Sequence, residues 1–533
     1  MFFDSRRSTV LAKNGMVATS QSLAAMAGLR IMMRGGNAVD AAVASAAVLN
    51  VVEPVSTGVG GDMFALVWDN KEKKVRAING SGRAPAAASP EELRAKDFSR
   101  IPEFGALSIT VPGAVHGWET LINACGTMPL SEVLQPAIQY AEEGFPVSDV
   151  IGFQWSAQLA KLSQLPSGQE LLLNGRPPRH GEVMSMPTLG RTLRTIAEGG
   201  AEAFYKGETG QRMAAFVQEQ GGWLSREDLA DHTSNWEEPI STDYRGVTCW
   251  ECPPSGHGIA ALEALNIAEG FDIPAMGAQS ADAYHHLVES MRLAFADALR
   301  YVADPALVPV PTAELLSKEY AKTRRALIDP KRAMASAPYG RVQDGGDTVY
   351  ISSVDGEGNA CSFIYSIFAN FGTGMVVPGT GIVLHNRGSL FSLDPNHPNV
   401  LAPRKRPYHT IIPAMATLDG ELYLCYGVMG GFMQPQGHLQ VISNVVDFGM
   451  DPQATLNALR FMVTQDSVVL EEGIPPEVVR ELESRGHRTS IVGGYQRGAA
   501  GGFGGAQLIQ RDRGTGVLRG ASEPRKDGSA VGW

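Results

Sequence analysis

The stretch GGDTVYISSVDGEGNACSFIYSIF, residues 345–368, carries the pattern that decides the fold. Thr348–Val354 alternates in character and is rich in β-branched residues, which is typical of a β-strand. Asp355–Asn359 contains an Asp-Gly pair and a second glycine, so it predicts a tight turn. Ala360–Phe368 predicts the returning strand. We therefore expect a hairpin that begins at Thr348, directly after Gly-Gly-Asp.

A second unit of the same kind lies downstream. Thr410–Thr417 and Leu422–Val428 predict two strands, and Asp419-Gly420 predicts the turn between them. Before the hairpins the chain is mainly helical. Ala281–Val302 has its apolar residues on one stripe, and Asn37–Val52 is apolar nearly all round, as in a helix buried on most faces. This order favours one α+β unit of stacked helix and sheet layers over a βαβ series.

The composition of the 533-residue chain excludes several classes of protein. Hydrophobic residues make up 44% and charged residues 19%, so the chain can bury a large core and is not disordered as a whole. The net charge of −11 argues against nucleic acid or an anionic membrane as a partner. The five cysteines are scattered and form no disulfide framework. Because the N-terminal residues lack an apolar signal-peptide core, we expect a cytoplasmic protein.

Common catalytic motifs do not explain the chain. No glycine-rich segment has the pattern of a phosphate loop or a dinucleotide fingerprint, and no Gly-x-Ser-x-Gly elbow occurs. No His-Glu-x-x-His zinc motif is present either. We therefore expect neither a metal nor a cofactor. Thr348, taken alone, is an ordinary residue at the start of a strand.

An ordered series of short motifs changes that interpretation. The series runs through nearly the whole chain and comprises Asn14–Ser20, Arg34–Ala42, Val52–Pro54, Gly58–Asp62, Val111–Trp118, Gly346–Thr348, Asn370–Gly374, Lys405–Pro407, Gly430–Gly431 and Asp527–Ala530. It resembles the γ-glutamyltransferase family. Many motifs in one order are far more specific than any single one.

The resemblance implies a fold and a mechanism. It implies the four-layer αββα sandwich of the N-terminal-nucleophile hydrolases and a proenzyme that cuts itself just before Thr348. The products would be a large fragment, residues 1–347, and a small fragment, residues 348–533, which remain associated. A Thr hydroxyl needs an adjacent base, and the α-amine released by the cut can be that base.

The resemblance also implies further site residues. Gly430 and Gly431 align with the oxyanion-hole amides of the family, a role that suits glycine because no Cβ blocks the backbone N–H groups. Ser366 aligns with a second hydroxyl close to the nucleophile.

The substrate pocket departs from the family pattern. Arg83 is offset by two positions from the arginine that holds the substrate α-carboxylate in γ-glutamyl enzymes. His409 and Thr410 replace two adjacent serines, and Leu390 replaces the acidic residue that holds the substrate α-amine. Arg387 replaces a neutral glutamine. Since arginine pairs well with carboxylates, the pocket predicts an acyl group with a carboxylate and no α-amine.

We therefore expect an amidohydrolase or acyltransferase that cleaves a small-molecule amide of a small carboxylated acyl group through an acyl-enzyme on Thr348. The alternatives are a standard γ-glutamyltransferase or glutathione hydrolase, an oxamate amidohydrolase, a glutaryl-cephalosporin acylase and a non-catalytic relative. Retention of Thr348 with Gly430 and Gly431 argues against the last.

Overall fold

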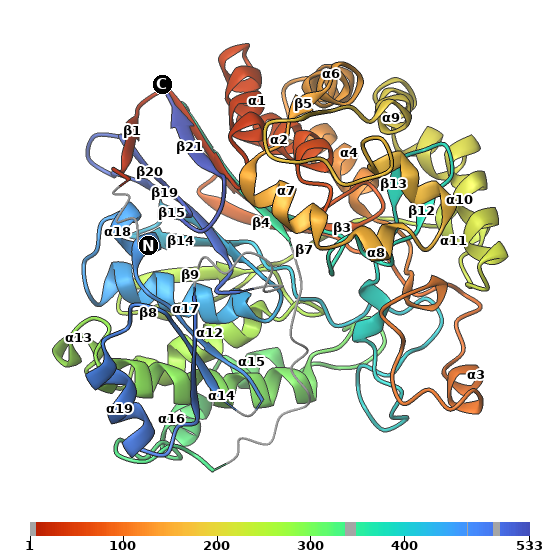
Figure 1. Cartoon of the computed structure of the whole chain (residues 1–533). Coiled ribbons are helices and arrows are strands. Elements are labelled where there is room, and N and C mark those ends of the chain that lie inside the picture. Colours follow the sequence, from red (N-terminus) through yellow and green to blue (C-terminus); the bar gives the residue numbers. More distant parts are fainter. Residues whose placement is uncertain (1–6, 336–347, 466, 494–501) are drawn as a thin grey trace.

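Two seven-stranded sheets form the centre of the molecule (Figure 1). The computed structural model describes residues 7–335, 348–465, 467–493 and 502–533. The residues just before the predicted cut, Gly345–Asp347, lie outside the described residues. Neighbouring strands within both sheets are antiparallel.

The strands of the two sheets come from both ends of the chain. The first sheet has the order β21 (Ser529–Gly532), β2 (Gly15–Thr19), β10 (Val349–Asp355), β11 (Ala360–Ser366), β3 (Asp62–Asp69), β4 (Lys74–Gly80) and β7 (Asn235–Glu237). The second sheet has the order β1 (Val10–Ala12), β20 (Leu518–Ser522), β19 (Gly505–Arg511), β15 (Glu421–Met429), β14 (Ala414–Leu418), β9 (Val247–Glu251) and β8 (Ile240–Tyr244).

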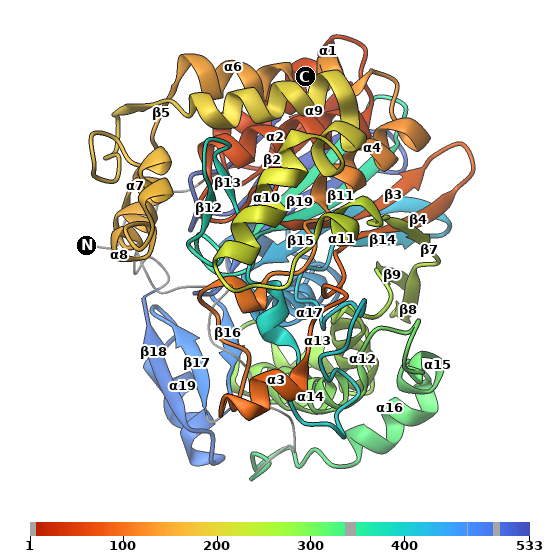
Figure 2. The same cartoon turned by 90° about the vertical axis from the view of Figure 1, so that its right-hand side faces the viewer.

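Helices cover the outer face of each sheet (Figures 1 and 2). Over the first sheet lie α1 (Ser22–Met33), α2 (Ala38–Val52), α4 (Ala114–Cys125), α5 (Leu130–Val133), α6 (Gln135–Glu143), α7 (Asp149–Ser156), α8 (Leu159–Leu162), α9 (Pro187–Tyr205), α10 (Glu208–Glu219) and α11 (Arg226–Ala230). Against the second lie α12 (Gly258–Ala268), α13 (Ile273–Met276), α14 (Ala281–Tyr301), α15 (Thr312–Leu315), α17 (Met433–Val446), α18 (Pro452–Asn457) and α19 (Pro476–Ser484).

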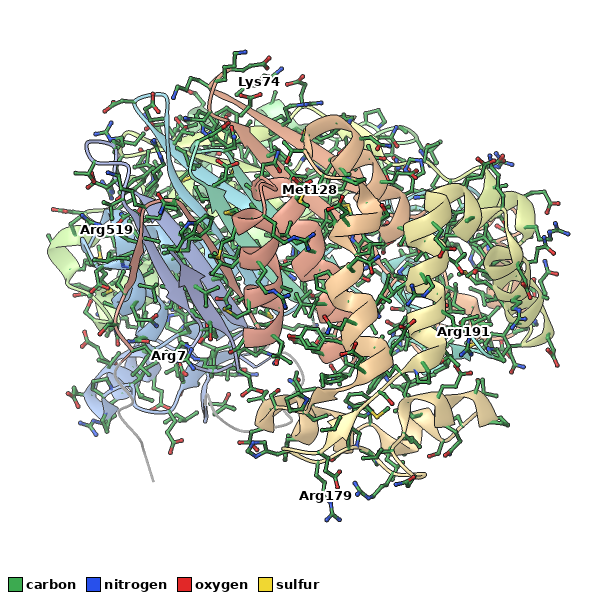
Figure 3. The ribbon with its side chains drawn as sticks, turned by 90° about the horizontal axis from the view of Figure 1, so that it is seen from above. Arg7, Lys74, Met128, Arg179, Arg191 and Arg519 are labelled. Atoms are coloured by element: carbon green, nitrogen blue, oxygen red, sulfur yellow. The ribbon has the colours of Figure 1, made fainter. Side chains whose placement is uncertain are left out.

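This arrangement is the predicted αββα sandwich. Figure 3, which looks down on the molecule, shows the helices over the first sheet lying side by side, with Arg519 on β20 of the second sheet far from Arg191 on α9. Smaller elements complete the chain: α3 (Pro90–Ala95), α16 (Lys318–Arg325), and the short strands β5 (Phe145–Pro146), β6 (Val183–Met184), β12 (Val376–Val377), β13 (Ile382–Val383), β16 (Phe461–Val463), β17 (Val468–Glu471) and β18 (Thr489–Val492).

The predicted buried helix is confirmed in α2. All residues of Ala38–Val52 are buried. Asn37 caps the helix, because its side chain accepts hydrogen bonds from the amides of Val39 and Asp40, while the Asp40 carboxylate accepts from the Asn37 amide. A cap of this kind typically contributes about 1 kcal/mol, and it fixes where α2 starts over the first sheet.

The predicted hairpin is confirmed as β10 and β11. The ladder pairs Val349 with Tyr365 at its open end, and Asp355 closes the turn by accepting the amides of Glu357 and Asn359. All residues of both strands are buried, because helices cover one face and the second sheet covers the other.

The two sheets pack tightly where β10 faces β15. The Tyr350 ring lies over Gly427, and a Cβ on that glycine would stand 2.4 Å from a ring carbon, so a larger residue would force the sheets apart. Ser352 donates a hydrogen bond to the Cys425 carbonyl at 3.0 Å. Each sheet contains strands from before and from after Thr348, so neither predicted fragment contains a whole sheet.

Candidate active site

Thr348 lies at the start of β10 and is only 2% exposed. Its hydroxyl donates to Ser366 Oγ at 3.3 Å, and Ser366 Oγ also accepts the Phe368 amide at 2.7 Å. Because Val349 stands opposite Tyr365 in the ladder, the residue before Val349 and the residue after Tyr365 are neighbours. The structure therefore brings the predicted nucleophile and the predicted second hydroxyl together.

Gly430 and Gly431 form the turn between β15 and α17. Their φ angles are +123° and +57°, in the region that favours glycine. Their carbonyls accept the amides of Met433 and Gln434, which begin α17. Within the described part of the chain, neither glycine amide donates to a protein acceptor. Both N–H groups are thus free to bind a substrate oxygen.

The facing strands place this turn beside Thr348. Ser352 contacts Cys425, and Tyr350 contacts Gly427. A residue two positions nearer the start of β10 therefore faces a residue two positions nearer the end of β15. One further step brings Thr348 level with the last residue of β15, immediately before the two glycines.

Asp62, at the start of β3, is the centre of a second group of buried side chains. Its Oδ2 lies 3.0 Å from His385 Nδ1, 3.1 Å from His409 Nε2 and 3.5 Å from Arg387 Nε. Its Oδ1 accepts the Gly82 amide at 3.1 Å. All four side chains are fully buried. One carboxylate thus orders residues from three separate segments.

The charges of this group follow from burial and pairing. Burial raises the pKa of Asp62, but the charge of His385 and the hydrogen bonds that His385 and His409 form with the carboxylate outweigh burial and hold that pKa well below its usual range. Burial, reinforced by the Arg387 charge, lowers the pKa of His409 to about 3, so that imidazole is neutral. Burial lowers the pKa of Arg387 to about 10, although Asp62 opposes it. Arg387 is therefore still charged near neutral pH.

Arg387 is incompletely hydrogen-bonded. Its Nη1 donates to Thr410 Oγ1 at 2.8 Å, and its guanidinium lies 4.6 Å from the centroid of the Phe368 ring. Its Nη2 is buried and has no partner among the described residues. Three of the predicted substrate-binding residues, Arg387, His409 and Thr410, are thus gathered around Asp62.

Arg83 and Leu390 are placed differently. Among the described residues, no hydrogen bond joins Arg83 to Arg387. Arg83 is half-buried, its carbonyl accepts the Val111 amide at 3.0 Å, and its charge adds to the burial that lowers the pKa of Arg406. Leu390 is partly buried and packs against the apolar core behind the second sheet.

Sequence reasoning missed Asp62 and His385 as site residues. His385 bridges Asp62 and the Thr110 carbonyl, which its Nε2 approaches to 2.9 Å. The only sequence signal for Asp62 was its place at the end of the motif Gly58–Asp62, which carried the resemblance and gave no partner. Across the described residues, no cluster of three or more His, Cys, Asp or Glu has the arrangement of a metal site. No helix among them is long and apolar enough to cross a membrane.

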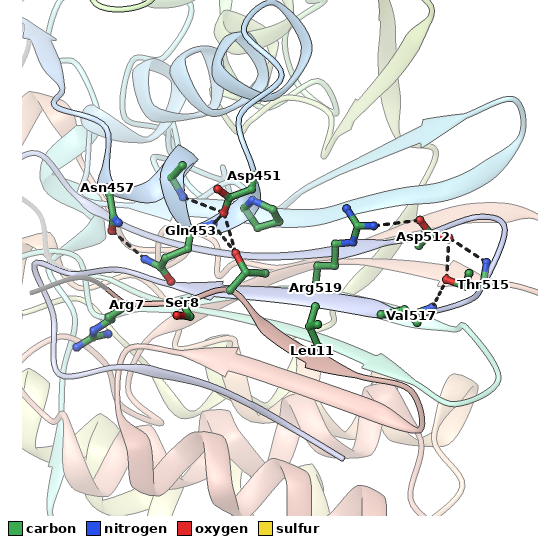
Figure 4. A pocket seen from close by; sticks show the side chains of 13 residues that line it. Arg7, Ser8, Leu11, Asp451, Gln453, Asn457, Asp512, Thr515, Val517 and Arg519 are labelled. Atoms are coloured by element: carbon green, nitrogen blue, oxygen red, sulfur yellow. Dashed lines mark hydrogen bonds and ion pairs between the residues drawn. The ribbon is translucent and has the colours of Figure 1, made fainter.

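A groove of about 830 Å³ lies elsewhere, at the β1 edge of the second sheet (Figure 4). Its lining comes from residues 7–11, 451–457 and 512–519. Its polar groups bond to one another: Asp451 accepts the Thr9 hydroxyl, and Asp512 pairs with Arg519. None of the residues predicted for the active site lines this groove.

Comparison with known proteins gives one consistent result. The sequence profile described as Gamma-glutamyltranspeptidase matches residues 24–533. The chain is 37% identical to the glutathione hydrolase-like YwrD proenzyme of Bacillus subtilis, over 98% of this chain and 99% of that one. It is 33% identical to the oxamate amidohydrolase proenzyme of Klebsiella pneumoniae, over 99% and 100%. The crystal structure of cephalosporin acylase from Bacillus halodurans superposes with a TM-score of 0.93 at 46% identity, covering 100% of this chain and 99% of that one. The chain belongs to the γ-glutamyltranspeptidase family.

Proposed function

We propose that the chain is a self-processing amidohydrolase or acyltransferase whose nucleophile is Thr348. The observation that carries this proposal is the joint placement of Thr348, Ser366 and the free amides of Gly430 and Gly431 at facing strand ends. The relatives named above, which include proenzymes of a glutathione hydrolase-like protein and of an oxamate amidohydrolase, support it.

The proposed chemistry needs only groups of this chain. After cleavage, the α-amine of Thr348 takes the hydroxyl proton while Oγ attacks the amide carbonyl. A free α-amine has a pKa of about 7.7–8.0, which suits a base near neutral pH. The amides of Gly430 and Gly431 stabilise the oxyanion. The leaving amine departs with the proton, and water or an amine then releases the acyl group from Thr348.

The acyl group is proposed to be small and to carry a carboxylate. Arg387 Nη2 is the buried donor that can receive that carboxylate, and the Thr410 hydroxyl stands beside it. Leu390 offers no charge to a substrate ammonium, so α-amino donors should be disfavoured. Asp62 compensates the Arg387 charge through Nε and holds the guanidinium in place.

A denaturing gel with N-terminal sequencing tests self-processing. We expect two fragments, the small one beginning at Thr348, and both should co-purify because they share each sheet. Thr348→Ala should remain one inactive chain. Ser353→Ala is the matched control, since Ser353 is a buried hydroxyl on the same strand that bonds the Ala38 carbonyl, and it should still be cut. An active, full-length Thr348→Ala protein would exclude the mechanism.

A donor panel tests the acyl specificity. Glutaryl anilide, oxamate and γ-glutamyl anilide all carry a carboxylate, but they differ in its distance from the amide carbonyl and in the presence of an α-amine, so their kcat/KM values separate the alternatives. We expect the glutaryl or oxamate donor to exceed the γ-glutamyl donor. Preferred hydrolysis of glutathione and γ-glutamyl anilide would replace the proposal with a standard glutathione hydrolase and leave the role of Thr348 unchanged.

A further inference from the structure

His438 lies in α17, the helix that follows the turn Gly430–Gly431, and it is fully buried. Its Nδ1 lies 2.6 Å from Glu251 Oε1 on β9. Its Nε2 lies 3.1 Å from the amide nitrogen of Val428 on β15. The imidazole thus joins a buried carboxylate to the backbone just two residues before the glycine turn.

Among the described residues, the end of β15 has no strand partner on one side. The neighbouring strand β14 begins at Ala414, which stands opposite Tyr426, so the ladder between β14 and β15 has ended before Val428. On its other side Val428 still pairs with Ala506 of β19. His438 Nε2 therefore takes the place of the missing strand carbonyl.

This geometry defines the protonation of the ring. A backbone amide can only donate, so Nε2 of His438 must present its lone pair to Val428. The ring proton is then on Nδ1 and is donated to Glu251. Burial raises the pKa of Glu251, and the attraction of His438 opposes that rise. The dyad fixes one tautomer and one ring orientation.

We propose that His438, oriented by Glu251, is a positioning residue that holds the Gly430–Gly431 turn where its amides meet the oxyanion. The inference rests on the proposed function, since it assumes that these amides bind the substrate oxygen. If the hydrogen bond from the Val428 amide to His438 is removed, the end of β15 is no longer held in place. The two glycines have no side chains that could restrain the turn.

The opposite face of α17 supplies a matched control. Gln440 accepts the Phe461 amide at 3.1 Å and donates to the Phe461 carbonyl at 3.0 Å, which attaches α17 to β16. Gln440→Leu thus removes these two buried hydrogen bonds, together with the bond from Gln440 Nε2 to the Gln436 carbonyl within α17, without touching the turn. If the variants on both faces of α17 lose acylation rate equally, the loss reflects only the packing of the helix.

The test compares His438→Asn, His438→Gln and Gln440→Leu, with p-nitrophenyl acetate as the acylating probe. Glutamine can place an acceptor near the position of Nε2, whereas asparagine reaches only the position of Nδ1. We expect His438→Asn to slow first-turnover acylation of processed Thr348 by about 10- to 100-fold, and His438→Gln to stay within about threefold of wild type. Gln440→Leu should lower the melting temperature but not the acylation rate.

The probe carries no carboxylate, so an error in the acyl specificity does not affect the result. Equal acylation rates for His438→Asn and Gln440→Leu would overturn the inference alone. Absence of any acylation in the wild type would overturn the proposed function and the inference with it. Should His438→Asn not fold, nitrogen-15 histidine spectra of the wild type decide: we expect His438 protonated on Nδ1 only, and a proton on Nε2 at pH 7 would overturn the inference.

Discussion

The side chains of Arg525 and Arg387 are both buried beside carboxylates, yet their hydrogen bonding differs. Every side-chain nitrogen of Arg525 donates: to both oxygens of Glu471, to one oxygen of Glu523 and to two backbone carbonyls. Although burial opposes it, these carboxylates raise the pKa of Arg525 above its ordinary value. Arg525 has no donor left for a ligand.

Arg387, in contrast, has a donor, Nη2, without a hydrogen-bond partner among the described residues. It has one hydrogen bond to Thr410, one loose ion pair with Asp62 at 3.5 Å, and an aromatic ring beside its guanidinium. A buried donor without a hydrogen-bond partner costs free energy, so such a donor is expected where a bound ligand accepts its hydrogen bond. The difference separates an arginine that holds the fold together from one that is placed to bind a ligand.

The largest expected effect is on stability, from Arg525→Met. Removing this side chain leaves Glu471 and Glu523 with too little positive charge in a buried site, which should lower the free energy of unfolding by about 3–5 kcal/mol. Denaturant unfolding of the uncut Thr348→Ala protein, with and without Arg525→Met, measures this difference. Exposed salt bridges contribute up to about 1 kcal/mol to stability. A decrease in the free energy of unfolding below that value would contradict the contrast between the two arginines.

Arg387→Leu should act on catalysis instead. We expect kcat/KM for a carboxylated donor to fall by about 10- to 150-fold, that is about 1.5–3 kcal/mol of transition-state binding. Self-cleavage should survive, because it needs no bound acyl carboxylate. Arg83→Leu is the matched control and should have a smaller effect. Equal kinetics of wild type and Arg387→Leu on every carboxylated donor would assign Arg387 a purely structural role.

The pH dependence of stability should reveal the neutral His409 beside Arg387. Its folded pKa of about 3 lies below the ordinary value of about 6.5, so the unfolded chain binds a proton that the folded chain does not between these values. Stability should therefore be fully present above about pH 6.5 and fall as the pH drops toward 3. His409→Asn should remove up to about 1.4 kcal/mol per pH unit of that slope. If His409→Asn leaves the slope of unfolding free energy against pH unchanged in the Thr348→Ala background, the prediction is wrong.

The smallest effect is expected from Leu390→Asp. An acid at this partly buried position should attract a substrate ammonium and move the preference toward γ-glutamyl donors by up to about tenfold, or about 1.4 kcal/mol. Leu390→Asn is the control of similar size without the charge. The ratio of kcat/KM for γ-glutamyl and glutaryl anilides is the measurement. The same ratio in both variants would show that Leu390 does not face the acyl group.

The local elements and the order of the motifs could be inferred from the sequence alone. The run Asn37–Val52, which is apolar nearly all round, predicted the buried helix α2, and β-branched strands joined by Asp-Gly turns predicted the two hairpins, because these patterns depend on neighbours a few residues apart. The family resemblance supplied the αββα layers and pointed to Thr348, Ser366, Gly430 and Gly431 as residues that act together.

Which charged side chains lie in contact follows only from the three-dimensional structure. Asp62 is separated from His385, Arg387 and His409 by more than 300 residues, and no local pattern predicts which buried arginine pairs with which acid. The sequence showed Arg387 as a new positive charge, whereas Asp62, the Phe368 ring and the unpartnered Nη2 became visible only in three dimensions. The reason is physical: the role of a buried charge depends on the donors and acceptors left around it after packing, and the sheets bring these together from distant segments.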